Sequence, residues 1–435
     1  MLNVAFILAP DDQNFDPFRH HPLTVFYLLT ILEAKFGDKV HCSIIDLRSV
    51  NQNHLKFYIP EMDIYFYSIT SPEYDKLSEV HSIIKEIYPK SKNIAGGVHV
   101  NIFQEDCAKV FDSICIGDGE DIIVDMVQDV MDNKLQKVYT NTNFGARRTT
   151  DMNAYPYPLR KYLPKPAIAH TNLLLGKNSH LVGTGVLFAK GCPFRCAFCA
   201  IETYGQQIRQ RAPHLVAEEI NYLKREYGVQ ALALKDDNGI PLNRKIAAPF
   251  LESLASCGIK WRGQSRANGI KEDMVKLAAE SGCTDLAIGI ESADLNVLRT
   301  IDKKLDLDEA KRYIEMLRKH GIGPRLLLVN GLPGEGPDIV EKTLKFIEEA
   351  NPASVVLCLL CPVPGSRITS HPEQFHMKIK PHTWTEIRMN FARFDATEKP
   401  RLLFEYDKGM GLSNETILAN YEYLQSVLRE RKLNF

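Results

Sequence analysis

Three cysteines stand close together in the middle of the chain, at Cys192, Cys196 and Cys199 in the stretch GCPFRCAFC. Their C-x3-C-x2-C spacing differs from the C-x2-C pairs of zinc ribbons, and no nearby fourth cysteine or histidine completes a tetrahedral zinc site. Three thiolates on one loop can instead hold three irons of a [4Fe–4S] cluster and leave one iron open for a further ligand. The glycine, proline and arginine around them predict a loop rather than three buried packing residues. A zinc site completed by a distant residue stays an alternative.

A second pair, Cys358 and Cys361, lies in the apolar run VVLCLLC. This run predicts a buried parallel strand in which cysteines act as small packing residues. The two cysteines are an odd number of residues apart, so only one of them can face a barrel interior. Cys361, at the strand end before Pro362, is the candidate catalytic residue, as a donor of a hydrogen atom or a proton.

The elements that must position these residues form two series. From the start to about residue 135, apolar runs such as NVAFILAP, KVHCSIIDL and DIYFYSIT alternate with helical patterns. This order predicts a doubly wound, Rossmann-like parallel sheet with helices on both faces. Ligands of such sheets bind beyond the carboxyl ends of the strands, where small residues let them approach the backbone. Binding positions are therefore expected at Ser68, Thr70, Gly96, Gly97, Gly117 and Gly119, with tight turns as the alternative role of the glycines.

The second series follows a proline-rich linker, which we place at residues 136–180. Six strand-and-helix units at residues 181–370 predict a partial (β/α)6 barrel, and the cysteine loop follows its first strand, where such barrels carry their chemistry. Residues 371–435 end in an amphipathic helical pattern and are expected to form a C-terminal extension that covers the substrate.

Composition excludes several classes of protein. The 53 Lys and Arg residues nearly balance 54 Asp and Glu residues, giving a net charge of −1, which argues against a nucleic-acid-binding face. The first residues lack the basic start of a signal peptide, and their apolar run is shorter than a transmembrane segment. The ten cysteines do not form the framework of a small secreted protein, so a reducing cytoplasm is the expected compartment.

The cysteine stretch resembles the signature of the radical S-adenosylmethionine (SAM) superfamily, including an aromatic residue, Phe198, before the last cysteine. The stretch QIRQRAPHLVAEEI resembles the arginine-rich turn and helix that follow the cluster in this family. The stretches LALKDDNG, WRGQSRA, LAIGIESAD, VNGLPGE and CPVPGSRI resemble the second to sixth strand ends of its partial barrels. The N-terminal half is similar to the cobalamin-binding domain that often precedes them, through HHPLTVFYLLTILE, AGGVHV and IGDGED. The resemblance covers about residues 1–370.

This resemblance implies that SAM binds the open iron and is cleaved by one electron to a 5′-deoxyadenosyl radical, which abstracts a substrate hydrogen. By the same resemblance, Phe198 lies near the adenine, and Asp236 and Glu291 face the ribose or the sulfonium region. Ser265 and Arg266 are expected at the methionyl carboxylate, for which an arginine is suited.

The sequence around each histidine indicates whether a histidine could bind the cobalt of cobalamin. None of the thirteen lies in the Asp-x-His-x-x-Gly motif that supplies a cobalt ligand, so any cobalamin would bind without that ligand. His99, in the GGVHVN turn, is a candidate cofactor contact, and the alternative is a histidine that satisfies backbone groups.

The leading hypothesis is a cobalamin-dependent radical SAM methyltransferase acting on an unactivated carbon or a phosphinate phosphorus. Its substrate would be a small molecule, lipid or peptide, and its electron donor a flavodoxin or ferredoxin. The alternative is a radical enzyme that forms rings, couples carbons or rearranges its substrate without methyl transfer. A cluster-bearing regulator with a degenerate radical site is the non-enzyme alternative, and the retained acidic strand ends argue against it.

Overall fold

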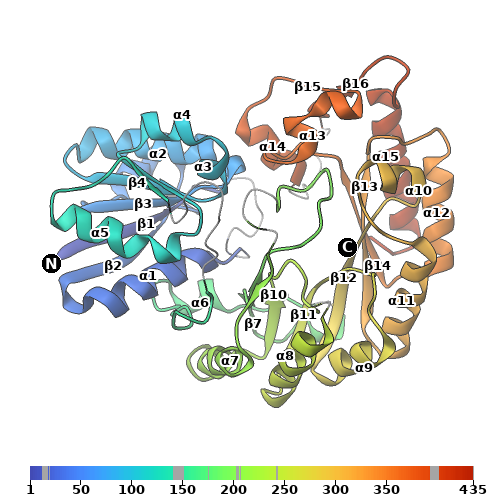
Figure 1. Ribbon diagram of the computed structural model, residues 1–435, viewed down its shortest axis with the longest axis horizontal. Coiled ribbons are helices and arrows are strands. Elements are labelled where there is room, and N and C mark those ends of the chain that lie inside the picture. Colours follow the sequence, from blue (N-terminus) through green and yellow to red (C-terminus); the bar gives the residue numbers. More distant parts are fainter. Residues whose placement is uncertain are drawn as a thin grey trace. The chain divides into compact units, whose positions relative to one another are not determined.

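The computed structural model describes residues 1–435 except 12–17, 19, 141–150, 175, 202–204, 206, 242, 392–400 and 435, and of 388–391 it describes the backbone only. By its internal contacts the chain divides into two compact units. The first contains Met1–Ile168 and a later segment that begins at Thr383, and the second contains most of the chain from Ala169 onward. Each unit has a parallel sheet with helices packed on it (Figure 1).

The first unit contains a six-stranded sheet in the order β2-β1-β3-β4-β5-β6, with every neighbouring pair parallel. The strands are β1 (Leu2–Leu8), β2 (Val40–Asp46), β3 (Ile64–Ser68), β4 (Lys92–Gly96), β5 (Ser113–Ile116) and β6 (Val138–Thr140). Because strand order reverses at β1, the switch point lies between β1 and β3, and ligands of such sheets bind beyond the carboxyl ends of these strands.

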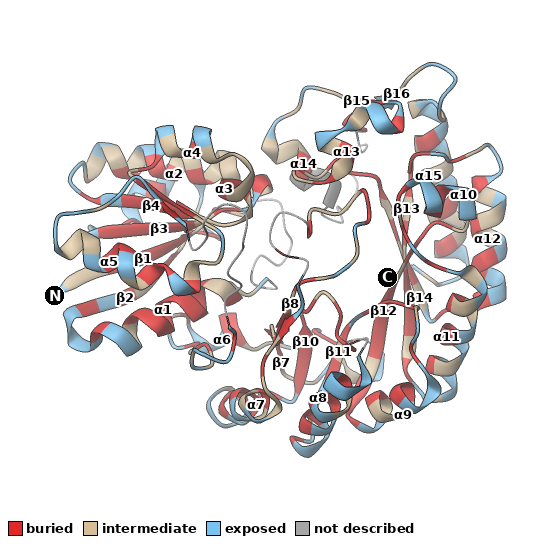
Figure 2. Ribbon diagram, in the orientation of Figure 1, coloured by how far each residue is buried: buried red, intermediate tan, exposed pale blue. Residues whose placement is uncertain are grey.

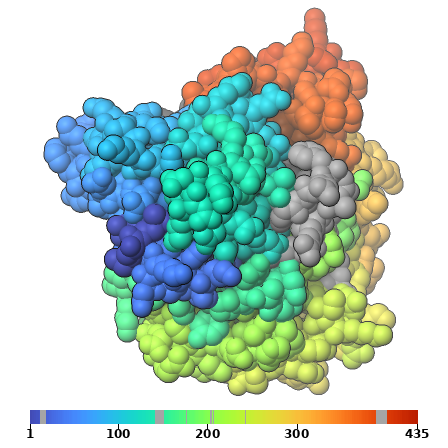
Figure 3. Space-filling model, turned by 60° about the vertical axis from the view of Figure 1, so that its left-hand side comes forward, coloured from blue at the N-terminus to red at the C-terminus, as the bar shows by residue number. Residues whose placement is uncertain are grey.

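Helices cover both faces of this sheet. One face packs against α1 (Leu23–Phe36) and α5 (Ile123–Met131). The other packs against α2 (Tyr74–Ile87) and α4 (Gln104–Val110), with α3 (Val98–Ile102) following β4 directly. Helices α1 and α5 pack against each other. In the space-filling view, blue atoms from the early part of this unit accordingly lie beside teal atoms from its later part (Figure 3).

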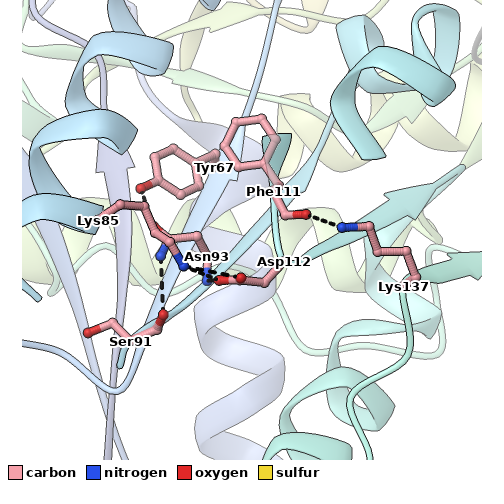
Figure 4. Close-up of polar contacts among 7 residues, drawn as sticks. All are labelled: Tyr67, Lys85, Ser91, Asn93, Phe111, Asp112 and Lys137. Carbon is pink, nitrogen blue, oxygen red and sulfur yellow. Dashed lines mark hydrogen bonds and ion pairs between the residues drawn. The ribbon is translucent and has the colours of Figure 1, made fainter. Parts of the chain in front are cut away.

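A buried polar cluster joins the elements near the amino-terminal ends of β4 and β5 (Figure 4). Asn93 is fully buried, and its side-chain oxygen accepts a hydrogen bond of 2.7 Å from the Tyr67 hydroxyl. Its backbone N–H donates to Asp112 at 2.7 Å, and Lys85 of α2 forms an ion pair of 3.2 Å with the same carboxylate. These bonds lie away from the carboxyl edge, so we assign the cluster a structural role.

The residues after β6 pack on the first unit. The Arg160 guanidinium lies 4.9 Å from the centroid of the Phe26 ring, and the Leu159 N–H donates to the Thr30 hydroxyl at 2.9 Å. Lys161 pairs with Glu33 at 2.7 Å. Part of the segment expected as a linker is therefore held against α1.

The second unit contains a six-stranded parallel sheet in the order β14-β13-β12-β11-β10-β7. The strands are β7 (Gly183–Val186), β10 (Ala231–Leu234), β11 (Lys260–Ser265), β12 (Cys283–Glu291), β13 (Gly323–Asn330) and β14 (Ser354–Leu359). Because this order follows the sequence, the helices between the strands lie together on the outer side of a curved, open sheet (Figure 1). They are α7 (Pro213–Tyr227), α8 (Arg244–Ser256), α9 (Glu272–Glu280), α10 (Leu295–Thr300), α11 (Leu307–Lys319) and α12 (Ile339–Ala350).

Local sequence explains where these helices begin and end. Pro213 occupies the first turn of α7, where its missing N–H costs nothing, and Gly228 ends the helix in the left-handed conformation with φ of 67°. The Asp306 carboxylate accepts a hydrogen bond of 2.7 Å from the Glu309 N–H and thereby caps α11. Buried residues line the sheet and the inward faces of the helices (Figure 2).

The end of the chain adds small elements to both units. The antiparallel pair of β15 (Met377–Ile379) and β16 (Phe404–Tyr406) and helix α15 (Asn414–Glu430) belong to the second unit, and α14 (Trp384–Phe391) belongs to the first. In the described part of the chain, no helix combines the length and apolar character that crossing a membrane requires.

Candidate functional site

The three clustered cysteines lie on the loop between β8 (Ala189–Lys190) and β9 (Arg209–Gln210), directly after β7. Cys196 is buried and Cys192 and Cys199 are half-buried. Burial raises the pKa of Cys192 and raises that of Cys199 to about 11, and the neighbouring thiols add to both pKa shifts. All three thiols lie on one loop, which fits a shared cluster whose assembly would displace the thiol protons.

Among the described residues, no group of three or more His, Cys, Asp or Glu side chains is arranged to hold a metal ion. Cysteine ligands of an iron–sulfur cluster bind different iron atoms, so their sulfur atoms stand farther apart than the ligands of a single ion. Phe198, between the second and third cysteines, is half-buried on the same loop.

Three consecutive side chains after β10 hold the start of the cysteine loop. Asp236 is buried and accepts a hydrogen bond of 2.7 Å from the Phe188 N–H, and Asp237 accepts one of 2.8 Å from the Gly191 N–H. Asn238 donates to the Cys192 sulfur at 3.9 Å. Burial raises the pKa of Asp236 to about 7 and also raises the pKa of Asp237. The other Asp236 oxygen, Oδ2, is buried without a hydrogen-bond partner among the described residues.

The later part of the cysteine loop is held by two other segments. The Ala197 N–H donates to the Ile301 carbonyl at 2.8 Å, and the Ala197 carbonyl accepts from the Ile368 N–H at 3.0 Å. Arg367 donates to the Arg195 carbonyl at 2.5 Å. Helix α13 (Arg367–Ser370) and the residues after α10 therefore fix the position of the loop that carries the cysteines.

Glu291 ends β12 in an unusual conformation. Its φ of 67° is in the left-handed region, which non-glycine residues rarely adopt and which is often found at functional sites. Its carboxylate forms an ion pair of 2.9 Å with Lys303, and both side chains are at least nine-tenths buried. A Cβ atom at Gly289 would collide with Glu291 Oε1 and lie 2.9 Å from Lys303 Nζ, so a larger residue at position 289 would displace the ends of both side chains.

Ser265 and Arg266 point in different directions, as expected of consecutive residues at a strand end. The Ser265 hydroxyl lies 2.9 Å from the Tyr313 hydroxyl in the helix layer. The Arg266 guanidinium lies 3.6 Å from the Phe194 ring centroid and donates to the Cys196 sulfur at 3.7 Å. Arg266 thus contacts the cysteine loop, whereas Ser265 is engaged with α11, and their shared role at a methionyl carboxylate stays a prediction.

Of the two cysteines at the last strand, only Cys358 lies within β14, so the predicted placement on opposite faces stays a prediction. Cys358 is half-buried. It lies in β14 two residues after Val356, which pairs with Leu327 of β13. Cys361 lies two residues beyond the end of β14, where the strand ladder no longer fixes its direction. Burial raises its pKa to about 12, so it carries its proton at neutral pH. A protonated thiol suits the predicted donor role, and no observed contact tests that role.

The candidate ligand positions of the first unit gather at the carboxyl edge of its sheet. Gly97 has φ of 99°, and a Cβ atom there would lie 2.7 Å from the backbone nitrogen and oxygen of Ile69, so the neighbouring strand end demands glycine. The Thr70 hydroxyl donates to Glu73 at 2.6 Å in a capping box. The remaining positions lie at or directly after the ends of β3, β4 and β5, namely Ser68, Gly96, Gly117 and Gly119.

His99 is enclosed rather than open to a ligand. It is 1% exposed, and its Nδ1 lies 3.0 Å from the Ser71 hydroxyl. Its ring stacks on Tyr74 at 4.2 Å and contacts Phe103 and Trp384 at 4.7 and 5.0 Å between centroids. Burial lowers the pKa of His99 to about 4, so the ring is neutral at pH 7.

Sequence reasoning missed three contributors to these sites. Lys303 lies twelve residues after Glu291, and only the need of a buried carboxylate for a cation could have suggested it. Asn238 follows the acidic strand end but carries no charge to mark it. Trp384 was included in the predicted C-terminal extension, and nothing in its surroundings signals a contact with His99.

Comparison with known proteins finds a family model and relatives that this chain resembles. Residues 186–347 match the model of the radical SAM superfamily. The chain is 26% identical over 337 residues to the bacteriochlorophyllide d C-12(1)-methyltransferase of Chlorobaculum tepidum, covering 76% of this chain and 67% of that protein. It is 25% identical over 365 residues to an anaerobic magnesium-protoporphyrin IX monomethyl ester cyclase of Rubrivivax gelatinosus, covering 79% of this chain and 65% of that protein. The chain thus spans about two thirds of the length of these curated relatives.

The fold also has a solved counterpart. TsrM of Kitasatospora setae, a radical SAM methyltransferase solved with cobalamin and a [4Fe–4S] cluster bound, matches 97% of this chain and 90% of its own with a TM-score of 0.68. At 16% identity this is a likeness of fold. It confirms the predicted fold class of a doubly wound sheet followed by a six-stranded partial barrel. Residues 186–347, which include the cysteine loop after the first barrel strand, thus match the radical SAM superfamily.

Proposed function

We propose that the protein is a cobalamin-dependent radical SAM methyltransferase that methylates an unactivated carbon or a phosphinate phosphorus. The observation that carries the proposal is the cysteine loop at the carboxyl end of the first strand of a six-stranded parallel sheet, held from both sides by backbone hydrogen bonds. We assign residues 1–135 to cobalamin binding, 136–180 to the linker, 181–370 to the radical SAM barrel and 371–435 to substrate covering.

The residues present fit a [4Fe–4S] cluster bound by Cys192, Cys196 and Cys199. When bound, such a cluster supplies the electron that cleaves SAM. Asp236 offers a buried carboxylate oxygen without a described partner, and Glu291 offers a carboxylate held by Lys303. Both lie at strand ends of the barrel, where polar groups of SAM would be bound. Cys361 holds a proton that a late step could use.

The first unit fits cobalamin at its switch point. Ser68 ends β3 and lies beside the carboxyl end of β1, where ligands of sheets with this strand order bind. The solved counterpart TsrM carries cobalamin, and the Chlorobaculum relative is a methyltransferase by name. Because His99 is enclosed by aromatic rings, we propose that no histidine of its turn binds cobalt.

A second candidate function is ring formation without methyl transfer. The Rubrivivax relative named as a cyclase supports it. In either case the substrate is a small molecule, lipid or peptide, and the electron donor is a flavodoxin or ferredoxin. Oxygen-sensitive clusters persist under reducing conditions, so we place the protein in the cytoplasm.

The test is anaerobic reconstitution of the full chain with iron, sulfide and hydroxocobalamin, followed by gel filtration and elemental analysis. We expect about four iron atoms and one cobalt atom per chain. With SAM and a reductant, methyl transfer yields both S-adenosylhomocysteine and 5′-deoxyadenosine, whereas the ring-forming alternative yields 5′-deoxyadenosine alone. Iron without cobalt would exclude the methyltransferase, and absence of iron would exclude both functions.

Two variants assign the metals to their sites. Cys196→Ser should lose the iron and keep the cobalt. Ser68→Trp should lose the cobalt and keep the iron, because its bulk fills the end of β3. Ser82→Trp, on the exposed face of α2, is the matched control and should keep both metals. An equal cobalt content in the two tryptophan variants would show that cobalamin does not bind at the end of β3.

A further inference from the structure

Arg266 is a buried cation with an unusual set of neighbours. It is 8% exposed, and its guanidinium lies 3.6 Å from the Phe194 ring centroid, inside the cysteine loop. One terminal nitrogen donates to the Cys196 sulfur at 3.7 Å and the other to the Lys304 carbonyl at 3.5 Å. Stacking and two hydrogen bonds therefore fix its planar group in one orientation.

No carboxylate among the described residues forms an ion pair with Arg266. Burial of a cation without an anion is costly, so such a group normally faces a negative partner. The atom that it faces is the sulfur of Cys196, which becomes a thiolate when it binds iron. The contact thus has the character of a charge-assisted hydrogen bond in the loaded protein.

Asn238 makes the corresponding contact with a second cysteine. It is 7% exposed and donates to the Cys192 sulfur at 3.9 Å. The two residues before it anchor Phe188 and Gly191 through their backbone N–H groups, so the amide is held beside the loop. One cysteine therefore has a cationic donor and another a neutral donor.

We propose that Arg266 and Asn238 are positioning residues that set the reduction potential of the cluster through its cysteine sulfurs. Reduction adds negative charge to a cluster and its thiolates, and donors to sulfur stabilise that charge. Both contacts therefore raise the potential, and the cationic contact raises it more. Arg266 then acts before SAM arrives, which distinguishes this role from binding of the methionyl carboxylate.

The proposal rests on the proposed function, because it requires the cluster. The experiment uses the reconstituted full chain without SAM, and iron content is measured first. The midpoint potential is then obtained from a redox titration followed by electron paramagnetic resonance. In Arg266→Gln we expect a more negative midpoint, with about a tenfold change in the ratio of oxidised to reduced cluster at a fixed potential, which is about 59 mV for one electron. Asn238→Ala should shift the midpoint in the same direction by less.

Two further variants complete the test. Arg266→Lys keeps the charge without the planar group and should fall between wild type and Arg266→Gln. Lys304→Gln removes an exposed charge nearby but keeps the carbonyl that Arg266 contacts, and its midpoint should equal that of wild type. A full cluster with unchanged potential in Arg266→Gln and weaker SAM binding would overturn the proposal in favour of carboxylate binding.

If Arg266→Gln does not retain iron, Arg266→Lys and Asn238→Ala decide the matter, and unchanged midpoints in both would overturn the proposal. Absence of iron from the wild type would instead contradict the proposed function itself.

Discussion

Glu291 and Lys303 illustrate how a single contact can combine strain, burial and charge. The carboxylate lies 2.9 Å from the ammonium group, Glu291 has a positive φ, and the two side-chain ends occupy the space beside Gly289. Such a conformation costs about 1–3 kcal/mol and persists where the surroundings enforce it. The pair holds a carboxylate in a fixed place at a strand end, where we expect SAM.

Removal of the cation should be costly. Lys303→Met leaves Glu291 buried without its partner, and we expect a loss of about 3–5 kcal/mol in the stability of the second unit. Hydrogen exchange of the β12 amides measures this locally. Lys311→Met breaks two surface pairs, with Asp308 and Glu349, and should cost less than about 1 kcal/mol. Equal exchange in the two variants would show that the buried pair does not stabilise β12.

His99 should make the first unit sensitive to acid. Its pKa is about 4 in the folded protein, because burial disfavours the charged ring, and about 6.5 in the unfolded chain. The unfolded state therefore takes up the proton first, and stability that is complete above about pH 6.5 is lost as the pH falls towards 4. Each unit of pKa difference corresponds to about 1.4 kcal/mol.

The measurement compares hydrogen exchange of α3 in wild type and His99→Gln at pH 7.5 and pH 5. The wild type should lose more protection on acidification than the variant, which has no titrating ring. A parallel loss in both proteins would assign the acid sensitivity to other groups.

At the scale of elements, the periodicity of the sequence predicted the order of strands and helices, but it did not predict the contacts that the connecting segments make. The cysteine signature is local, so Cys192, Cys196 and Cys199 were found as a group, whereas the different partners of Ser265 and Arg266 were not anticipated. Residues 301–304 show what sequence reasoning could not find. The Ile301 carbonyl accepts from Ala197, and the Lys304 carbonyl accepts from Arg266. The Lys303 ammonium group donates to Glu291. Backbone carbonyls carry no sequence signal, so only the folded chain reveals this junction.

The polar cluster of the first unit offers a test at this scale (Figure 4). Asn93→Ala leaves the buried Tyr67 hydroxyl without its acceptor, and we expect a loss of about 1–3 kcal/mol. Tyr67→Phe combined with Asn93→Ala should lose less than the sum of the single changes, because no orphaned hydroxyl remains. Urea unfolding followed by hydrogen exchange of β3 and β4 provides the values, and additive losses would contradict the coupling.

At the scale of the whole molecule, the first unit is not continuous in sequence. Trp384 packs its ring against His99 and Phe103, and the Thr385 hydroxyl and N–H both donate to Asp75 at 3.2 and 3.1 Å. The expectation of a C-terminal segment devoted to covering the barrel did not anticipate these contacts, because residues 310 positions apart are unrelated by any local pattern.

Trp384→Ala should therefore destabilise the first unit by about 1–3 kcal/mol through the loss of aromatic packing. Exchange of the α3 amides should accelerate, while that of β12 and β13 in the second unit stays unchanged. Tyr423→Ala, which removes an exposed ring from α15, is the control and should alter neither unit. Unchanged exchange of α3 in Trp384→Ala would show that the ring packing does not support this edge.

The discontinuity also sets an order of events on the ribosome. Residues 1–168 are synthesised first, yet the helix that packs on His99 begins at Trp384. At about 5–20 residues per second, the intervening stretch takes roughly 10–40 s to make. During that interval the nascent first unit exposes the rings of Tyr74, His99 and Phe103 that Trp384 later contacts. The first unit therefore cannot finish folding until the segment that begins at Trp384 has been synthesised. A chaperone that binds aromatic surfaces has that interval in which to act.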